Sequence, residues 1–137
     1  DGVSLLLVSE DPAILAMAQR DIERSLTIPK TLKCATHLNE VWAAINEQAP
    51  DLIVLDSKGS GAMNAVELLA ALRREAATAV LPVVFLAHST KEAEETAAWP
   101  LVKTLIKPCG SREFCSALET SLAVAMNRAN TPFPLWR

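Results

Sequence analysis

Residues 51–61, DLIVLDSKGSG, join a strand-like segment to a glycine-rich loop through an acidic residue. The segment Leu52 to Leu55 is apolar throughout, which is typical of a strand that is buried on both faces of a parallel sheet. Asp56 ends this segment, and the serine, lysine and glycine residues after it predict a loop. A carboxylate at that place is either a solvated turn residue or the centre of a site. The other segments of the chain help to distinguish these two interpretations.

Strand-like and helix-like segments alternate along the whole chain. Apolar runs typical of strands lie at residues 3–8, 31–36, 52–55, 83–87 and 101–106. Apolar residues recur at helical spacing in segments 12–26, 39–49, 65–76, 91–98 and 111–128. The expected N-caps of these helices are Asp11 (followed by Pro12), Asn39, Ser89 or Thr90, and Ser111. Five strands that alternate with five helices predict an α/β fold, a doubly wound parallel sheet with helices on both faces. Its central strands should bury Leu5, Leu7, Ile53, Leu55, Val84 and Leu86.

Length, charge and cysteine content set the class of protein. The chain has 137 residues, half of them hydrophobic, which suits a single domain with its own core. We expect this domain to span residues 1–128, followed by a tail or linker at 129–137. The net charge of −3, with both signs interspersed, argues against binding to nucleic acid or to a membrane. Cys34, Cys109 and Cys115 lack C-x-x-C spacing, so we expect reduced, buried thiols in a cytoplasmic protein.

Polar residues follow several of the predicted strands at the point where each strand ends. They are Ser9, Glu10 and Asp11 after the first strand, Asp56 after the third, His88 after the fourth and Lys107 after the fifth. In open parallel sheets, ligands bind at the carboxyl ends of the strands, where the strand order reverses. We therefore expect Glu10 and Asp56 to lie side by side, with Lys107 across the mouth of the site.

Two neighbouring carboxylates repel each other unless a cation or a proton relieves the repulsion. Mg²⁺ is the natural cation, since proteins hold it by one or two carboxylates together with water and phosphate oxygens. A lysine ammonium group opposite them supplies a positive charge for a phosphate. The combination of Glu10, Asp56 and Lys107 therefore predicts a phosphoryl-transfer site in which a carboxylate can be the nucleophile.

Four segments carry a resemblance to a known family. They are LLLVSEDP at 5–12, DLIVLD at 51–56, LPVVFLA at 81–87 and LIKP at 105–108. With these segments, residues 3–128 resemble a receiver domain of the bacterial response regulators of two-component signalling. The resemblance implies a flavodoxin-like sheet in the order 2-1-3-4-5 and a cis peptide bond between Lys107 and Pro108.

The resemblance also implies an activity. A histidine kinase or phosphotransfer protein would donate a phosphoryl group to Asp56 in a phosphorelay, with Lys107 as the second catalytic residue. Glu10, Asp56 and the backbone carbonyl of Lys58 would hold Mg²⁺, and Ser9 and Asp11 would line the same pocket. Such a signalling domain catalyses at most its own phosphorylation and slow dephosphorylation.

Three residues depart from the family's pattern. Ser9 stands where the family has the first of two acidic residues, so only Glu10 is left as the metal acid of this loop. Ala87 replaces the hydroxyl residue that ends the fourth strand, and Thr104 replaces the aromatic residue of the fifth strand. These last two positions rearrange on activation in the family, so both switch positions are altered here.

Two alternatives of a different class remain open. The first is a degenerate pseudo-receiver, a phosphorylation-independent protein-interaction module, which the three departures favour. The second is a phosphatase with an aspartate nucleophile, which is disfavoured because Lys58 stands where a second aspartate would supply the acid. Retention of Asp56 and Lys107 favours the phosphoaccepting receiver.

A partner surface is expected by the same resemblance. In the family, the usual partner surface is the face formed by the fourth helix, the fifth strand and the last helix. Here that face would include Trp99 and Lys103. We expect a weak homodimer or a docked partner protein on it.

Overall fold

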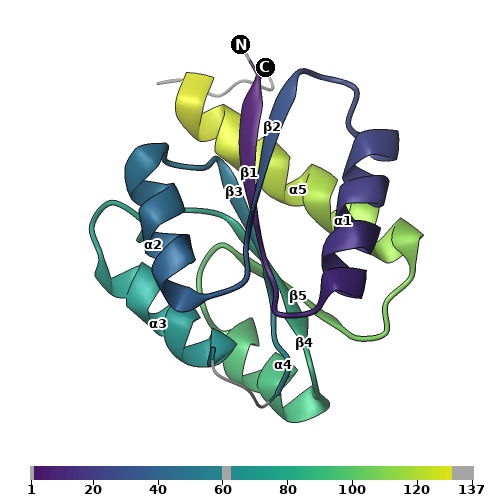
Figure 1. The fold of residues 1–137 in the computed structure, drawn as a ribbon, viewed down its shortest axis with the longest axis vertical. Helices are drawn as coiled ribbons and strands as arrows, with labels where there is room; N and C mark the ends of the chain where they lie inside the picture. Colours follow the sequence, from purple (N-terminus) through teal and green to yellow (C-terminus); the bar gives the residue numbers. More distant parts are fainter. Residues whose placement is uncertain (1, 60–62, 131–137) are drawn as a thin grey trace.

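The computed structural model describes residues 2–59 and 63–130, and it has the alternation of strands and helices that the sequence predicts (Figure 1). The strands are β1 (Val3–Val8), β2 (Lys30–Ala35), β3 (Leu52–Asp56), β4 (Val83–Ala87) and β5 (Val102–Ile106). The helices are α1 (Pro12–Ser25), α2 (Leu38–Glu47), α3 (Ala65–Arg74), α4 (Thr90–Ala97) and α5 (Ser111–Asn130). Expected and observed ends agree within the usual scatter of one or two residues.

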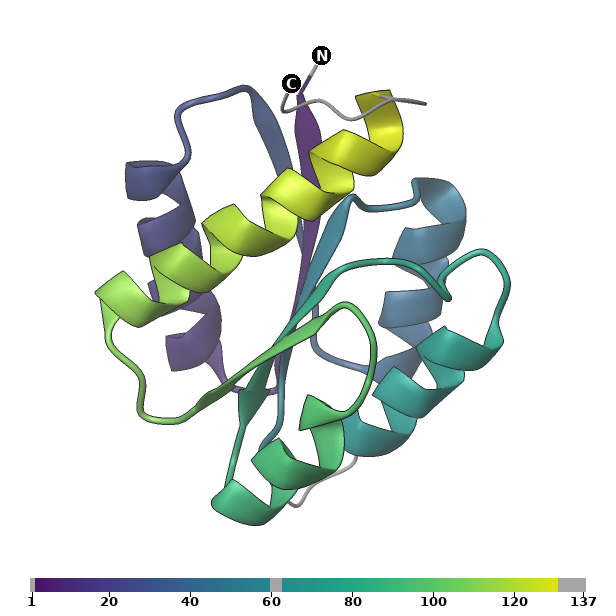
Figure 2. The ribbon, with the colours of Figure 1, turned by 180° about the vertical axis from the view of Figure 1, so that it is seen from behind.

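The sheet is parallel throughout, and its strand order is β2-β1-β3-β4-β5. Helices α1 and α5 cover one face, and α2, α3 and α4 cover the other (Figures 1 and 2). This is the flavodoxin-like arrangement that the sequence predicts. The order reverses between β1 and β3, so the carboxyl ends of these two strands are where a ligand site is expected.

Each face of the sheet carries its own hydrophobic core. Successive residues of β1 and β3 alternate between the two cores, as the pleat of a strand requires. The six residues predicted to form the centre, Leu5, Leu7, Ile53, Leu55, Val84 and Leu86, are all fully buried, which confirms that prediction. Because both faces of the central strands are covered, their apolar runs are continuous instead of alternating with polar residues.

The ends of the helices confirm some of the predicted caps and correct others. The Asp11 side chain accepts from the backbone N–H of Ala13, and Ser89 accepts from that of Glu92, as expected for N-caps. The prediction of Asn39 as a cap is wrong, because α2 begins one residue before it, with His37 as the N-cap. Glu40 accepts from the backbone N–H groups of Thr36 and His37, and these bonds lower the pKa of Glu40.

Two further predictions need correction on the side of α1 and α5. Ser111 is the first residue of α5 and not its cap, and its hydroxyl lies 3.2 Å from a carboxylate oxygen of the buried Asp21. The three cysteines are free, as expected, but they are not buried. Cys34 is exposed at the edge strand β2, and Cys109 and Cys115 are half-buried.

An arginine holds the segment that connects α4 to β5. The guanidinium group of Arg73 donates to the carbonyl oxygens of Thr78, Leu81, Pro100 and Leu101, at 2.8 to 3.4 Å. Burial lowers the pKa of this guanidinium. Leu101 has a positive φ of 60°, a conformation that a residue with a side chain keeps only where its surroundings fix it. The arginine contacts supply that constraint.

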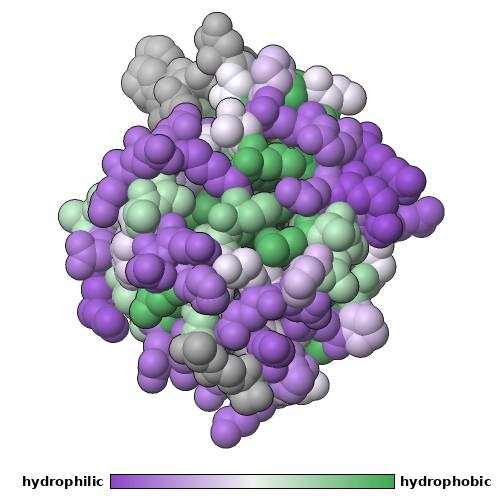
Figure 3. Space-filling view, viewed as in Figure 1, coloured by the Kyte–Doolittle hydropathy of each residue, from purple (hydrophilic) through white to green (hydrophobic). Residues whose placement is uncertain are grey.

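The molecular surface is mostly hydrophilic on the face that shows the edge strand β2, with apolar residues gathered along its middle (Figure 3). Among the described residues, no helix combines the length and the apolar character needed to cross a membrane. α5 continues through Asn130, and the rest of the predicted tail, 131–137, lies outside the described residues.

Candidate functional site

Asp56 is the last residue of β3, and its side chain is buried at the carboxyl end of the sheet. β3 lies between β1 and β4, so the residues that follow those two strands lie on either side of it. Only 2% of the Asp56 side chain is exposed. Because a buried carboxylate is costly unless it is paired, its partners define the site.

Both carboxylate oxygens of Asp56 have a close side-chain partner. The ammonium Nζ of Lys107 lies 2.5 Å from Oδ1, and the hydroxyl Oγ of Ser9 lies 2.7 Å from Oδ2. Lys107 directly follows β5, and the peptide bond that joins it to Pro108 is cis, as expected. The ammonium compensates the negative charge, and the hydroxyl fixes the second oxygen, so the carboxylate is held in one orientation.

Ser9 is almost fully buried and is oriented by its own neighbour. The backbone N–H of Asp11 donates to Ser9 Oγ at 2.9 Å, which uses the oxygen of the hydroxyl as an acceptor. The single hydroxyl proton is then best placed on the short contact to Asp56. The residue that departs from the family's acidic pattern is therefore a hydrogen-bond donor to the predicted acceptor.

The other predicted metal residues are less closely gathered. Glu10 is half-buried, and its Oε2 accepts from the backbone N–H of Met63 at 3.1 Å, which ties the carboxylate to the end of the loop after β3. Lys58 is exposed. Within residues 2–59 and 63–130, no three acidic, histidine or cysteine side chains form a metal-binding group. A pair of carboxylates and a backbone carbonyl still suits Mg²⁺, which commonly takes one or two carboxylates and keeps several waters.

The two residues predicted to stand at altered switch positions, Ala87 and Thr104, have defined environments. Ala87 ends β4 and is fully buried. The Thr104 hydroxyl of β5 lies 3.1 Å from the hydroxyl of Thr96, a buried residue of α4. A pair of hydroxyl groups 3.1 Å apart thus connects α4 to β5.

Two residues of the site were not predicted from the sequence. The carbonyl oxygen of Ser57 accepts from Lys107 Nζ at 2.7 Å, so the ammonium bridges Asp56 and its neighbour. The Ser57 hydroxyl in turn donates to Glu92 of α4, at 2.7 Å. A serine after a strand predicts only a loop, and nothing in the spacing of 35 residues between Ser57 and Glu92 connects them.

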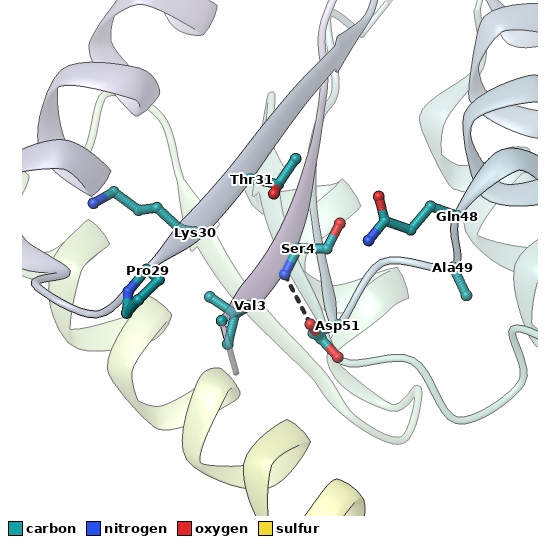
Figure 4. A pocket seen from close by; sticks show the side chains of 9 residues that line it. Val3, Ser4, Pro29, Lys30, Thr31, Gln48, Ala49 and Asp51 are labelled. Carbon is teal, nitrogen blue, oxygen red and sulfur yellow. Dashed lines mark hydrogen bonds between the residues drawn. The ribbon is translucent and has the colours of Figure 1, made fainter.

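A polar pocket lies at the opposite, amino-terminal end of the sheet, away from Asp56. Its volume is about 460 Å³, and it lies between the starts of β1 and β2 and the end of α2. Asp51 accepts there from the backbone N–H of Ser4 at 2.8 Å, and the side chains of Ser4 and Gln48 point toward one another (Figure 4). This pocket shares no residue with the Asp56 site.

Comparison with solved structures identifies the class of fold. No family model and no curated protein sequence matches the chain. Solved structures do match it. The signal receiver domain of a signal transduction histidine kinase from Syntrophus aciditrophicus is 16% identical, with a TM-score of 0.77, over 97% of this chain and 98% of that one.

Two response regulators are similar to the same degree. The chemotaxis response regulator CheY4 of Vibrio cholerae is 19% identical, with a TM-score of 0.74, over 89% of this chain and 100% of that one. The bacteriophytochrome response regulator RtBRR is 23% identical, with a TM-score of 0.76, over 98% of this chain and 86% of that one. The chain thus has the flavodoxin-like α/β fold in the form found in response regulator receiver domains.

Proposed function

We propose that this chain is a phosphoaccepting receiver domain and that Asp56 takes the phosphoryl group. The observation that supports this most directly is the buried carboxylate of Asp56, paired with the Lys107 ammonium at 2.5 Å at the carboxyl end of β3. A buried aspartate used only as a turn residue would have no need of Lys107, which follows a strand two positions away in the sheet. We place the functional unit at residues 1–128, with 129–137 as a tail or linker whose first two residues belong to the last turn of α5.

The reaction is a phosphoryl transfer between two residues. A carboxylate oxygen of Asp56 attacks the phosphorus of a phosphohistidine, a new O–P bond forms, and the N–P bond breaks. The bond's electron pair returns to the imidazole nitrogen of the donor, and the product is an acyl phosphate. Lys107 stays within reach of the transferred oxygens and compensates their charge.

Mg²⁺ is the proposed cofactor. Asp56, Glu10 and the backbone carbonyl of Lys58 would hold it, since these oxygen donors fit the preference of this ion. When bound, it supplies positive charge that offsets the negative charge of the phosphoryl oxygens. Glu10 would have to leave the backbone N–H of Met63, or share that contact, to serve as a ligand.

We expect the transfer to be slow, for two reasons. The attacking oxygen of Asp56 has to give up either its contact with Lys107 or that with Ser9. Ala87 offers no hydroxyl to the phosphoryl group, and a hydrogen bond to a charged acceptor is worth roughly 1.5–3 kcal/mol, or about one to two powers of ten in rate.

A second candidate function is that of a pseudo-receiver that binds a partner protein without phosphorylation. The observation that favours it is the saturation of Asp56: with Lys107 and Ser9 in place, the carboxylate is stable without a metal. For the phosphoaccepting receiver, a histidine kinase or phosphotransfer protein is the proposed partner class. The proposed docking face is still that of α4, β5 and α5, where Lys103 is exposed and Trp99 is half-buried against the core.

The experiment that tests the proposal is intact-protein mass spectrometry after treatment with acetyl phosphate and Mg²⁺. The wild type should gain the mass of one phosphoryl group, and Asp56→Asn should gain none. Glu10→Gln should retain the acceptor but need more Mg²⁺ for the same yield. No mass gain in the wild type at any Mg²⁺ concentration would replace the phosphoacceptor by the pseudo-receiver.

A further inference from the structure

Four residues connect the loop after β3 with the loop after β4. The Ser57 hydroxyl donates to Glu92 Oε2 at 2.7 Å, and the backbone N–H of His88 donates to Glu92 Oε1 at 2.7 Å. The backbone N–H of Gly59 donates to Ser57 Oγ at 3.2 Å. A Cβ atom on Gly59 would lie 2.4 Å from Cδ2 of His88, so the imidazole ring packs directly on the glycine. Both oxygens of one carboxylate thus hold two loops together.

The direction of each hydrogen bond is fixed by the chemistry of its groups. Ser57 Oγ accepts from Gly59, so its own proton is free to point at Glu92, and the carboxylate can only accept. Ser57 is buried, with 2% of its surface exposed, whereas Glu92 is half-buried. A charged acceptor for a buried hydroxyl is among the stronger hydrogen bonds in proteins.

Capping of α4 does not explain the position of Glu92. Ser89 already caps the helix by accepting from the backbone N–H of Glu92 at 3.2 Å. In a capping box, the glutamate at this place bonds to the backbone N–H of the cap residue itself. Here one oxygen of Glu92 bonds to the residue before the cap, His88, and the other to Ser57 of a different loop.

The contacts of Ser57 lead directly to the acceptor. The Ser57 carbonyl accepts from Lys107 Nζ at 2.7 Å, and the same nitrogen lies 2.5 Å from Asp56 Oδ1. The position of Ser57 therefore decides where the ammonium lies between its two acceptors. The hydroxyl of Ser57 is held by Glu92, so a residue of α4 acts on the ammonium through one intermediate residue.

We propose that Glu92 is a positioning residue for the acceptor site, acting on Lys107 and Asp56 through Ser57. It couples the first turn of α4 to the acceptor by a route that does not use the Ala87 side chain, which has no polar group at the end of β4. The network is a property of the unphosphorylated protein, and only its effect on phosphoryl transfer rests on the proposed function.

The first test uses the unphosphorylated protein, without metal, and measures amide hydrogen exchange at Gly59 and His88 by NMR. Glu92→Ala removes the acceptor of His88 and should also speed exchange at Gly59, in the other loop. Ser57→Ala removes the acceptor of Gly59 and should also speed exchange at His88. We expect these cross-effects to be roughly tenfold, the scale of one hydrogen bond to a charged group. Effects confined to the directly bonded amide would overturn the proposal.

A spectroscopic measurement follows the effect on the acceptor. The ¹⁵Nζ signal of Lys107 and the carboxyl ¹³C signal of Asp56 should both shift in Glu92→Ala. The matched control is Glu95→Gln, which removes an exposed charge from the same helix and should leave both signals in place. Unchanged signals in Glu92→Ala would show that Glu92 serves only its own helix.

The consequence for phosphoryl transfer is measured with acetyl phosphate over a range of concentrations. Glu92→Ala should lower the maximal rate roughly tenfold while leaving the half-saturating donor concentration unchanged, because Glu92 does not contact the donor. Glu92→Gln keeps one acceptor oxygen, so its maximal rate should lie between those of the wild type and Glu92→Ala. If the wild type takes up no phosphoryl group, the proposed function fails, but the exchange and shift measurements still decide the role of Glu92.

Discussion

Replacing Lys107 by methionine should cost this protein much more stability than an exposed lysine would. The Asp56 side chain is 2% exposed and that of Lys107 is 20% exposed, so the pair is largely removed from water. Lys107→Met leaves a buried carboxylate whose remaining side-chain partner is the Ser9 hydroxyl, and it also frees the carbonyl of Ser57. Breaking a buried ion pair costs about 3–5 kcal/mol, and the partial exposure of the lysine places this one near the lower end, about 3 kcal/mol.

The assay is urea denaturation of the wild type, Lys107→Met, Asp56→Asn and the double variant. Asparagine carries no charge that needs a cation, so the lysine replacement should cost much less in the Asp56→Asn background. The expected coupling free energy is therefore well above 1 kcal/mol. A loss below about 0.5 kcal/mol for Lys107→Met, or additivity of the two replacements within about 0.5 kcal/mol, would refute this account of the site.

Three further replacements test individual features of the structure. Ser9→Asp adds a second carboxylate beside Asp56, so it should tighten Mg²⁺ binding, measured by calorimetry, and should destabilise the metal-free protein. Equal Mg²⁺ affinity of the wild type and the variant would show that residue 9 does not contribute to metal binding. Gly59→Ala should lower the free energy of unfolding by about 1–2 kcal/mol, because Gly59 has a φ of +83° and the added Cβ would meet the ring of His88. An unchanged free energy of unfolding in urea denaturation would contradict that packing. Arg73→Lys should cost about 1–3 kcal/mol in the same assay, since an ammonium cannot reach the four carbonyl groups that the guanidinium serves; unchanged stability would make the arginine contacts incidental.

The fold and the centre of the site could be predicted because they depend on local patterns. The apolar runs of the central strands are long and bounded by turns, and their alternation with helical segments leaves few arrangements of the sheet. The juxtaposition of Asp56 and Lys107 follows from the strand order, since both residues come where strands end on the same edge. The roles of these two residues in phosphoryl transfer stay predictions.

The remaining features depend on contacts that sequence spacing does not encode. The predicted cap Asn39 lies two residues after the observed N-cap His37, and both are polar residues at the start of the same helix, with Leu38 between them. The network of Ser57 and Glu92 depends on where two loops meet after the sheet has formed. The role of Ser9 as a hydrogen-bond donor to Asp56 also depends on the folded structure, because it follows from the backbone N–H of Asp11 donating to Ser9 Oγ.

The two ends of α4 are held by different partners, and this difference predicts which part of the helix can respond to a change at Asp56, the proposed acceptor. Its first turn is tied to the loop after β3 through Glu92, whereas its last turn is tied to β5 by the hydroxyls of Thr96 and Thr104, 3.1 Å apart. Thr96 is fully buried, and a pair of small hydroxyl groups has no second arrangement comparable to the rotation of a ring. A change at Asp56 can therefore reach the first turn through Lys107 and Ser57 without displacing the last.

We accordingly expect beryllofluoride with Mg²⁺ to change amide exchange at residues 89–92 and to leave residues 96 and 97 unchanged. In Thr104→Val, which keeps the size of the side chain and removes the hydroxyl, the change should extend to the end of the helix. Bound beryllofluoride is detected independently by ¹⁹F NMR, so that a silent helix is not mistaken for an empty site. A uniform change along the whole of α4 in the wild type would show that the pair of hydroxyl groups does not hold the end of this helix in place.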